Sequence, residues 1–155
     1  MENPFMARAI RLSVESVQSK DGGPFGAVIV KDGKIIAEAS NDVTGTNDPT
    51  AHAEILAIRE ACKKLNDFEL KGCEMYTSCE PCPMCLGAIY WARLDRVYFG
   101  NTAADAAKID FSDAFIYDEI ARPHAQRNIP MIQMMHEQAL EGFRAWAEKP
   151  NKTPY

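Results

Sequence analysis

The stretch "PFGAVIVKDGKIIAEAS", residues 24–40, decides the fold, because it holds two apolar runs on either side of Asp32-Gly33. Valine and isoleucine favour extended backbone, and Asp-Gly suits a two-residue turn that needs positive φ at both positions. The stretch therefore predicts a β-hairpin.

Helical patterns flank this hairpin. Apolar residues recur at helical spacing after an Asn-Pro pair, which predicts an amphipathic helix over residues 4–19. Beyond the hairpin, residues 50–65 show the same periodicity, and Asp48 before Pro49 has the form of an N-cap followed by proline. Each flanking segment is thus expected to pack as a helix against the sheet.

The remaining chain alternates between strand and helix patterns. This alternation predicts an α/β fold, with a mixed sheet between helical layers, and 155 residues is the usual size of a single domain. The expected elements are a strand at 73–78, a helix at 83–93, a strand at 96–100, short helical pieces over 102–121, a last strand at 130–135 and a last helix at 136–149.

Composition excludes several classes of protein. The chain carries 17 basic and 22 acidic residues, a net charge of −5, which disfavours the positive surface of a nucleic-acid binder. No apolar run approaches the length of a membrane span, and the N-terminus lacks the pattern of a secretory signal. Five cysteines, three of them within residues 79–85, resemble a metal or redox cluster rather than a disulfide framework. We expect a cytoplasmic protein without nucleic-acid or membrane partners.

Two short motifs carry the chemistry: "HAE", residues 52–54, and "PCPMC", residues 81–85. Each falls in the opening turn of an expected helix, where side chains can straddle the helix end and the macrodipole favours anions. Cys82 and Cys85 are three apart and therefore share a face. Two helix N-termini are expected to converge and to bring His52 to both thiols.

One histidine and two cysteines supply the three protein ligands of a catalytic zinc, which leaves the fourth position open for water. Zinc lowers the pKa of that water to about 7, and a carboxylate that is not a ligand can then take up and return its proton. Glu54 suits this role. His-x-Glu followed by Pro-Cys-x-x-Cys is the signature of zinc-dependent nucleobase deaminases.

Each residue also has a structural interpretation. His52 alone is more often a hydrogen-bonded structural histidine, Glu54 alone a solvated helix residue, and Cys82-x-x-Cys85 alone a redox pair. Cys79-x-x-Cys82 repeats the spacing, so a closed Cys3His site that includes Cys79 is a further alternative. The joint occurrence of both motifs favours the open zinc site.

The stretches "GGPFGAVIV", "NDPTAHAE" and "YTSCEPCPMCLGAIYWAR", together with the tail ending in Tyr155, resemble the bacterial guanine deaminases of the cytidine deaminase-like superfamily. The resemblance covers nearly the whole chain. It implies a three-layer α/β/α fold with a five-stranded mixed sheet and zinc-dependent hydrolysis of guanine to xanthine and ammonia. It also implies a homodimer in which the C-terminal segment crosses to the partner and helps to close its active site.

The resemblance also assigns purine contacts. It places Asn41 at the purine edge, Phe25 and Trp91 at the walls, and Asp113 and Tyr155 beside the base; the Ala53 backbone would lie near the attacked carbon. Each has a simpler interpretation as well. Phe25 and Trp91 occur in apolar patterns typical of a core, Asn41 lies where turn formers are common, Asp113 could cap a helix, and a terminal Tyr155 is usually frayed.

Three other functions remain open on sequence alone. A tRNA adenosine deaminase shares both motifs, although the acidic charge and a last helix with few cations disfavour it. A guanosine or other purine nucleoside deaminase would need room for ribose. A noncatalytic zinc-stabilised binding module would have no use for a proton-carrying glutamate such as Glu54.

Overall fold

The computed structural model describes residues 2–19 and 22–155. The chain divides into two compact units, Met1–Ala114 and Phe115–Tyr155. The first unit contains the sheet and the motifs, and the second contains the C-terminal helices.

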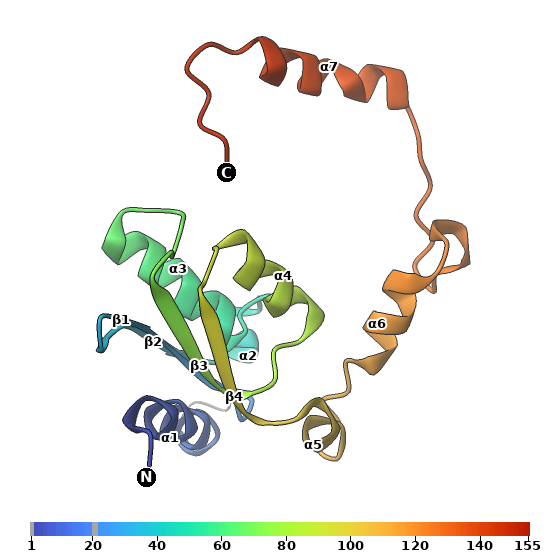
Figure 1. Cartoon of the computed structure of the whole chain (residues 1–155). Helices are drawn as coiled ribbons and strands as arrows, with labels where there is room; N and C mark the ends of the chain where they lie inside the picture. Colours follow the sequence, from blue (N-terminus) through green and yellow to red (C-terminus); the bar gives the residue numbers. More distant parts are fainter. Residues whose placement is uncertain (1, 20–21) are drawn as a thin grey trace. The chain divides into compact units, whose positions relative to one another are not determined.

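Among the described residues, four strands form one mixed sheet in the order β2-β1-β3-β4. The strands are β1 (Gly26–Lys31), β2 (Lys34–Ser40), β3 (Cys73–Cys79) and β4 (Arg96–Asn101) (Figure 1). β1 pairs antiparallel with both β2 and β3, whereas β3 and β4 are parallel. Asp32 and Gly33 have φ values of 50° and 72°, so the predicted hairpin turn is confirmed.

The prediction of a fifth strand is wrong, because residues 130–135 are not extended into any sheet. Within residues 115–155 no segment forms a strand with which they could pair. The Met131 amide instead donates to the carbonyl of His124, 3.2 Å away, which is a contact within the same connection. A run of β-prone side chains does not make a strand without a partner for its backbone groups.

Helices cover both faces of the sheet, which confirms the three-layer arrangement. α1 (Pro4–Ser19) packs on one face through Ala9 and Leu12 against Val28 and Val30. α3 (Ala53–Leu65) and α4 (Pro83–Trp91) pack on the other face, in a core that includes Ile29. Alternate residues of β1 thus point into two different cores, and the first five residues of this strand are buried.

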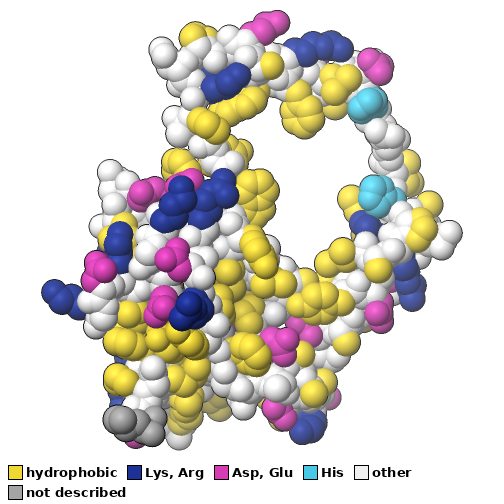
Figure 2. Space-filling model, viewed as in Figure 1, with side chains coloured by type: hydrophobic (Ala, Val, Ile, Leu, Met, Phe, Trp, Pro, Cys, Tyr) yellow, Lys and Arg dark blue, Asp and Glu magenta, His cyan; other side chains and the backbone are white. Residues whose placement is uncertain are grey.

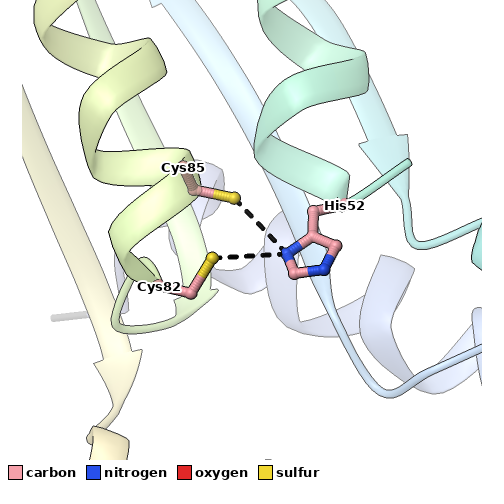
Figure 3. Close-up of side chains that lie close together, drawn as sticks. All are labelled: His52, Cys82 and Cys85. Atoms are coloured by element: carbon pink, nitrogen blue, oxygen red, sulfur yellow. Dashed lines mark hydrogen bonds between the residues drawn. The ribbon is translucent and has the colours of Figure 1, made fainter. Parts of the chain in front are cut away.

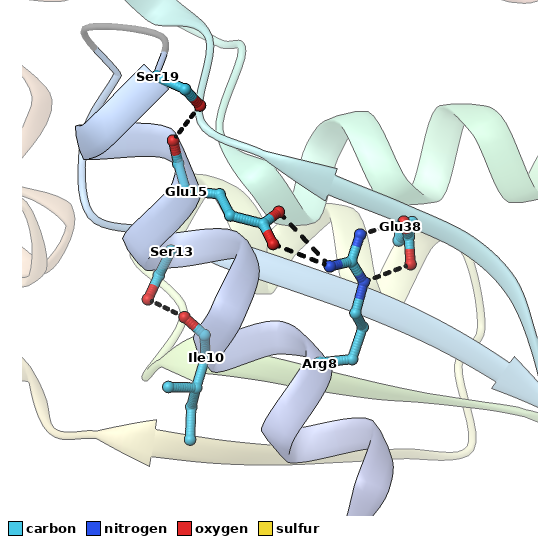
Figure 4. Close-up of polar contacts among 6 residues, drawn as sticks. All are labelled: Arg8, Ile10, Ser13, Glu15, Ser19 and Glu38. Carbon is cyan, nitrogen blue, oxygen red and sulfur yellow. Dashed lines mark hydrogen bonds and ion pairs between the residues drawn. The ribbon is translucent and has the colours of Figure 1, made fainter.

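α1 is also joined to the sheet by an arginine between two carboxylates (Figure 4). Arg8 donates to Glu38 on β2 through Nη2 at 2.6 Å and Nε at 2.9 Å, and its Nη1 lies 3.3 Å from Glu15. The Arg8 guanidinium lowers the pKa of the Glu38 carboxyl, chiefly through these hydrogen bonds. This contact fixes the helix against an edge strand.

The remaining helices are short except for the last. They are α2 (Val43–Thr46), α5 (Ala103–Ala107), α6 (Ala114–Ala121), the 3-10 helix η1 (His124–Gln126) and α7 (His136–Glu148). Over residues 2–19 and 22–155, no helix has the length and apolar character needed to cross a membrane.

Candidate active site

Three metal-ligand side chains meet where α3 and α4 begin (Figure 3). His52 is the N-cap of α3, Cys82 is the N-cap of α4, and Cys85 lies in the first turn of α4. The Nδ1 atom of His52 is 3.5 Å from Sγ of Cys82 and 3.5 Å from Sγ of Cys85. The helix starts converge here, as the spacing of the two motifs predicts.

The donor set fits a zinc ion. A tetrahedral zinc with Zn–N of about 2.0–2.1 Å and Zn–S of 2.3 Å separates a nitrogen from a sulfur donor by roughly 3.5 Å. The observed N···S distances of 3.5 Å match that separation, and the three ligand atoms all lie within 4.8 Å of one another. One imidazole and two thiols are also the soft, borderline donors that zinc prefers.

Local backbone geometry explains why these side chains face one another. His52 and Cys82 both have extended backbone, with φ/ψ of −71°/152° and −67°/169°, so each side chain reaches across the end of its helix. Pro83 occupies the first position of α4, where a missing amide is tolerated. The predicted N-cap at Asp48 is wrong, because its carboxylate accepts from Thr50 in a turn and α3 begins at Ala53.

The two thiols are electronically different. Hydrogen bonding from Cys85, followed by that from His52, lowers the pKa of Cys82 to about 4, although burial opposes the shift. Hydrogen bonding to Cys82 raises the pKa of Cys85, and burial adds to this effect. The neighbours of Cys82 thus favour its thiolate form, which is the form that binds a metal.

Glu54 lies beside this set without belonging to it. The side chain sits in the first turn of α3 with 5% of its surface exposed, and burial raises the pKa of its carboxyl. Its Oε2 is 3.5 Å from Sγ of Cys85, and its Oε1 is 3.3 Å from the Thr77 hydroxyl. A buried carboxylate next to a metal centre can take up and release a proton without occupying a ligand position.

Thr77 was not predicted from the sequence. The signal that could have indicated it is a hydroxyl within "YTSC", a strand expected to be buried between neighbours, because a buried hydroxyl needs a hydrogen-bond partner.

Cys79 does not join the donor set. Within the described part of the chain, the group of metal-ligand atoms comprises His52, Cys82 and Cys85. The sulfur of Cys79 lies 3.9 Å from the carbonyl of Thr102, and burial raises the pKa of its thiol to about 11. Because Cys79 lies outside this group of atoms, the geometry favours the open three-ligand site over the closed four-ligand alternative.

Two of the predicted purine contacts lie close to each other. Asn41 has 7% of its surface exposed, and its Oδ1 accepts from the amides of Gly23 and Val43, each at 3.3 Å. Phe25 packs edge-to-face on Phe111, with ring centroids 5.0 Å apart. A Cβ atom on Gly23 would stand 3.2 Å from the Phe25 ring and 3.4 Å from Cγ of Asn41. Glycine at this position thus lets both side chains approach.

The other predicted contacts are spread more widely. Ala53 is fully buried at the first position of α3, and Trp91 ends α4 with 67% of its surface exposed. Asp113 precedes α6, and burial raises the pKa of its carboxyl, with smaller contributions from Cys82 and Glu80. Tyr155 belongs to the second unit and is exposed. The structure therefore groups Asn41 with Phe25, and Asp113 within electrostatic range of Cys82.

The sequence model of the cytidine and deoxycytidylate deaminase zinc-binding region matches residues 1–101, which include both motifs. The chain belongs to this zinc-binding deaminase family. Its donor set and its buried Glu54 are the features that the family signature describes.

Within this deaminase family, the chain is 55% identical over 151 residues to a guanine deaminase from Bacillus subtilis, covering 97% of each sequence. The crystal structure of a Bacillus subtilis guanine deaminase superposes with a TM-score of 0.96 at 54% identity and covers 100% of this chain and 99% of that one. A tRNA-specific adenosine deaminase from Aquifex aeolicus is 54% identical over 76 residues, 49% of this chain and 50% of that protein. Similarity to the guanine deaminase thus extends through the second unit.

Proposed function

We propose that this protein is a guanine deaminase, which hydrolyses guanine to xanthine and ammonia. The observation that carries the proposal is the buried Glu54 carboxyl, 3.5 Å from Cys85 in a three-donor metal site. Near-full-length similarity to a guanine deaminase supports guanine as the substrate. The rival tRNA adenosine deaminase covers only about half of the chain, and a net charge of −5 is unfavourable for binding RNA.

We propose that His52, Cys82 and Cys85 hold Zn²⁺, which would bind water, lower its pKa to about 7 and thereby supply the nucleophile. Glu54 takes the water proton as oxygen bonds to C2 of guanine. It then delivers that proton to N3 and transfers the proton of the new C2 hydroxyl to the exocyclic nitrogen. Ammonia departs as the bond from C2 to the exocyclic nitrogen breaks and the C2=O bond forms. The low exposure of Glu54, 5%, keeps this proton from exchanging freely with solvent during the reaction.

The purine requires a flat apolar slot with a few fixed polar groups. Phe25 is suited to form one wall, since Phe111 holds its ring edge-on, and two backbone amides fix the plane of the Asn41 carboxamide. Asp113, with a pKa raised by burial, offers a carboxyl for the donor groups of guanine. The complete set of proposed contacts is Phe25, Asn41, Ala53, Trp91, Asp113 and Tyr155.

The test is ammonia release from guanine, with guanosine, adenine and cytosine assayed in parallel on zinc-loaded protein. Glu54→Gln keeps the shape of the side chain but cannot carry the proton, so we expect turnover to fall by about 10²–10⁴-fold with zinc content unchanged. Undiminished turnover in Glu54→Gln would remove the proposed proton carrier. Inosine formation in a tRNA anticodon loop without turnover of guanine would assign the chain to the rival activity.

We further propose that residues 1–155 act as one deaminase domain within a homodimer, with the C-terminal segment covering the partner's site. No residue of 115–155 is buried in the single chain, although this unit is rich in large apolar side chains (Figure 2). Phe143 is 76% exposed, Ile132 81% and Tyr155 73%. Exposed apolar surface of this extent favours association with another protein. In a homo-oligomer, the commonest kind of soluble assembly, that protein is a second copy of the same chain. The cytoplasmic location stays a prediction.

A further inference from the structure

Thr77 occupies a buried position in the central part of the sheet, close to the site. It lies in β3, between Ala27 of β1 and Phe99 of β4, so neighbouring strands pair with its backbone on both sides. Its surface is 1% exposed. A threonine side chain is also stiff about χ1, because its Cβ carries two heavy atoms. The hydroxyl of Thr77 is therefore a fixed point against which a more flexible side chain can be oriented.

The hydroxyl of Thr77 faces two acceptors. Its Oγ1 is 3.3 Å from Oε1 of Glu54 and 3.1 Å from the carbonyl oxygen of Cys79. The contact with the Cys79 carbonyl places the hydroxyl beside the loop that leads to Cys82. The contact with Glu54 joins the same hydroxyl to α3. A hydroxyl has a single hydrogen to donate, so Thr77 donates to one of these two acceptors at a time.

The two carboxylate oxygens of Glu54 consequently have different surroundings. Oε1 points to Thr77, in the sheet, whereas Oε2 points to the metal-ligand set, 3.5 Å from Sγ of Cys85. Only one of the oxygens thus lies on the side where water and substrate would react. The other is held by a group that has no part in the chemistry.

We propose that Thr77 is the positioning residue of the deamination: it anchors Oε1 of Glu54, so that Oε2 is the oxygen that carries the proton. This inference rests on the proposed function. An electron pair of water forms the bond to C2, the π pair of the C2=N3 bond moves to N3, and the water proton passes to Oε2. Oε2 gives that proton to N3 and then takes the proton of the new C2 hydroxyl. It passes this second proton to the exocyclic nitrogen, which leaves as ammonia with the pair of its bond to C2, while an oxygen lone pair forms the C2=O bond of xanthine.

The test removes the hydroxyl but keeps the shape. Thr77→Val is nearly isosteric, and loss of an outer-shell hydrogen bond at a metal site typically lowers activity by about 10–100-fold. We expect kcat for guanine to fall within that range, with KM changed by less than about threefold, because Thr77 is 1% exposed and offers no surface for a substrate contact. Thr77→Ser restores the hydroxyl, and its kcat should return close to that of the wild type. Zinc content should be equal in all three proteins.

Ser78→Ala is the matched control. Ser78 is the next residue of β3, is 2% exposed, and uses its hydroxyl to accept from the amide of Gly26, 3.0 Å away. It should keep kcat within about threefold of the wild type. An equal loss in Ser78→Ala and Thr77→Val would mean that any buried hydroxyl of β3 matters, and wild-type kcat in Thr77→Val, or failure of Thr77→Ser to rescue, would equally overturn the proposal.

A structural readout keeps this test separate from the proposed function. In crystals of the zinc-loaded wild type, Glu54 Oε1 should lie within hydrogen-bond distance of Thr77, and in Thr77→Val the Glu54 carboxyl should turn to another rotamer. An unchanged Glu54 in Thr77→Val refutes the anchoring role whatever the substrate. If the wild type leaves guanine intact while Glu54 is held by Thr77 in the wild type and turned in Thr77→Val, only guanine deamination is refuted.

Discussion

The two units of this chain differ in what they enclose. Residues 1–114 surround a sheet with a buried core on each face and hold the donor set at the start of two helices. Residues 115–155 form helices and connections in which no residue is buried. The first unit therefore has the packing of a folded domain, whereas the second leaves most of its large apolar side chains exposed.

The largest expected effect is in the first unit, at the metal ligands. Cys85→Ser replaces a thiolate with a hydroxyl that binds zinc weakly, so we expect zinc to be lost and guanine turnover to fall by at least about 10³-fold. Cys79→Ser is the matched control, since Cys79 is also a buried cysteine of this region but lies outside the donor set. Elemental analysis and ammonia release measure both. Zinc loss in Cys79→Ser with zinc retained in Cys85→Ser would reverse the ligand assignment.

The next effect concerns the second unit. If a second copy covers α7, Phe143→Asp places a charge in an apolar interface, which costs several kcal/mol unless the charge finds a partner. We expect the dissociation constant of the dimer to rise by at least about 100-fold, measured by sedimentation or light scattering across a concentration series. Gln138→Asp puts the same side chain elsewhere on α7 and should leave the dimer intact. A wild-type monomer, or dimers of equal strength in all three proteins, would contradict the proposed interface.

A smaller effect tests whether the second unit serves the site. Tyr155→Ala removes only the terminal ring, which the proposal places at the purine of the partner's site. Loss of one buried ring contact should raise KM by about tenfold while kcat and zinc content change little. Lys152→Ala, three residues earlier in the same tail, is the control. Equal KM values in the two variants and the wild type would leave Tyr155 as an ordinary chain end.

The same contrast explains what could be predicted from sequence. The Asp32-Gly33 turn and the start of α4 at Cys82 depend on neighbouring residues, and the structure places them as expected. Thr77 was missed because its contact with Glu54 joins residues 23 apart in the chain and depends on how β3 packs against α3.

The errors also have physical causes. Asp48 has the sequence of a helix cap, but its carboxylate closes a turn with Thr50 before α3 begins. Residues 130–135 have strand propensity, yet no segment of 115–155 offers a backbone edge for pairing. Propensity thus predicted the local backbone geometry well, but it did not predict which segment pairs with which. For this reason the structure of the second unit was harder to predict than that of the first.

The smallest expected effect concerns an ion pair at the surface of the first unit, between Arg8 and Glu38. Arg8 joins α1 to β2 through Glu38, but both side chains are partly exposed, so Arg8→Met should lower the free energy of unfolding by only about 0.5–1 kcal/mol at neutral pH. The methionine keeps the apolar stem of the side chain. Because the folded-state pKa of Glu38 lies below its usual 4.5, the ion pair stabilises the protein above that pH, and this stability is lost as pH falls through the folded-state pKa. The difference in the free energy of unfolding between wild type and Arg8→Met, measured by denaturant unfolding, should therefore shrink between pH 7 and the acid range.

Lys71→Met is the control. It breaks an ion pair with Glu69 that lies within one loop and links no helix to the sheet. If the free energies of unfolding of wild type and Arg8→Met still differ by the same amount at acid pH, Arg8 stabilises the contact of α1 with β2 by packing rather than by charge.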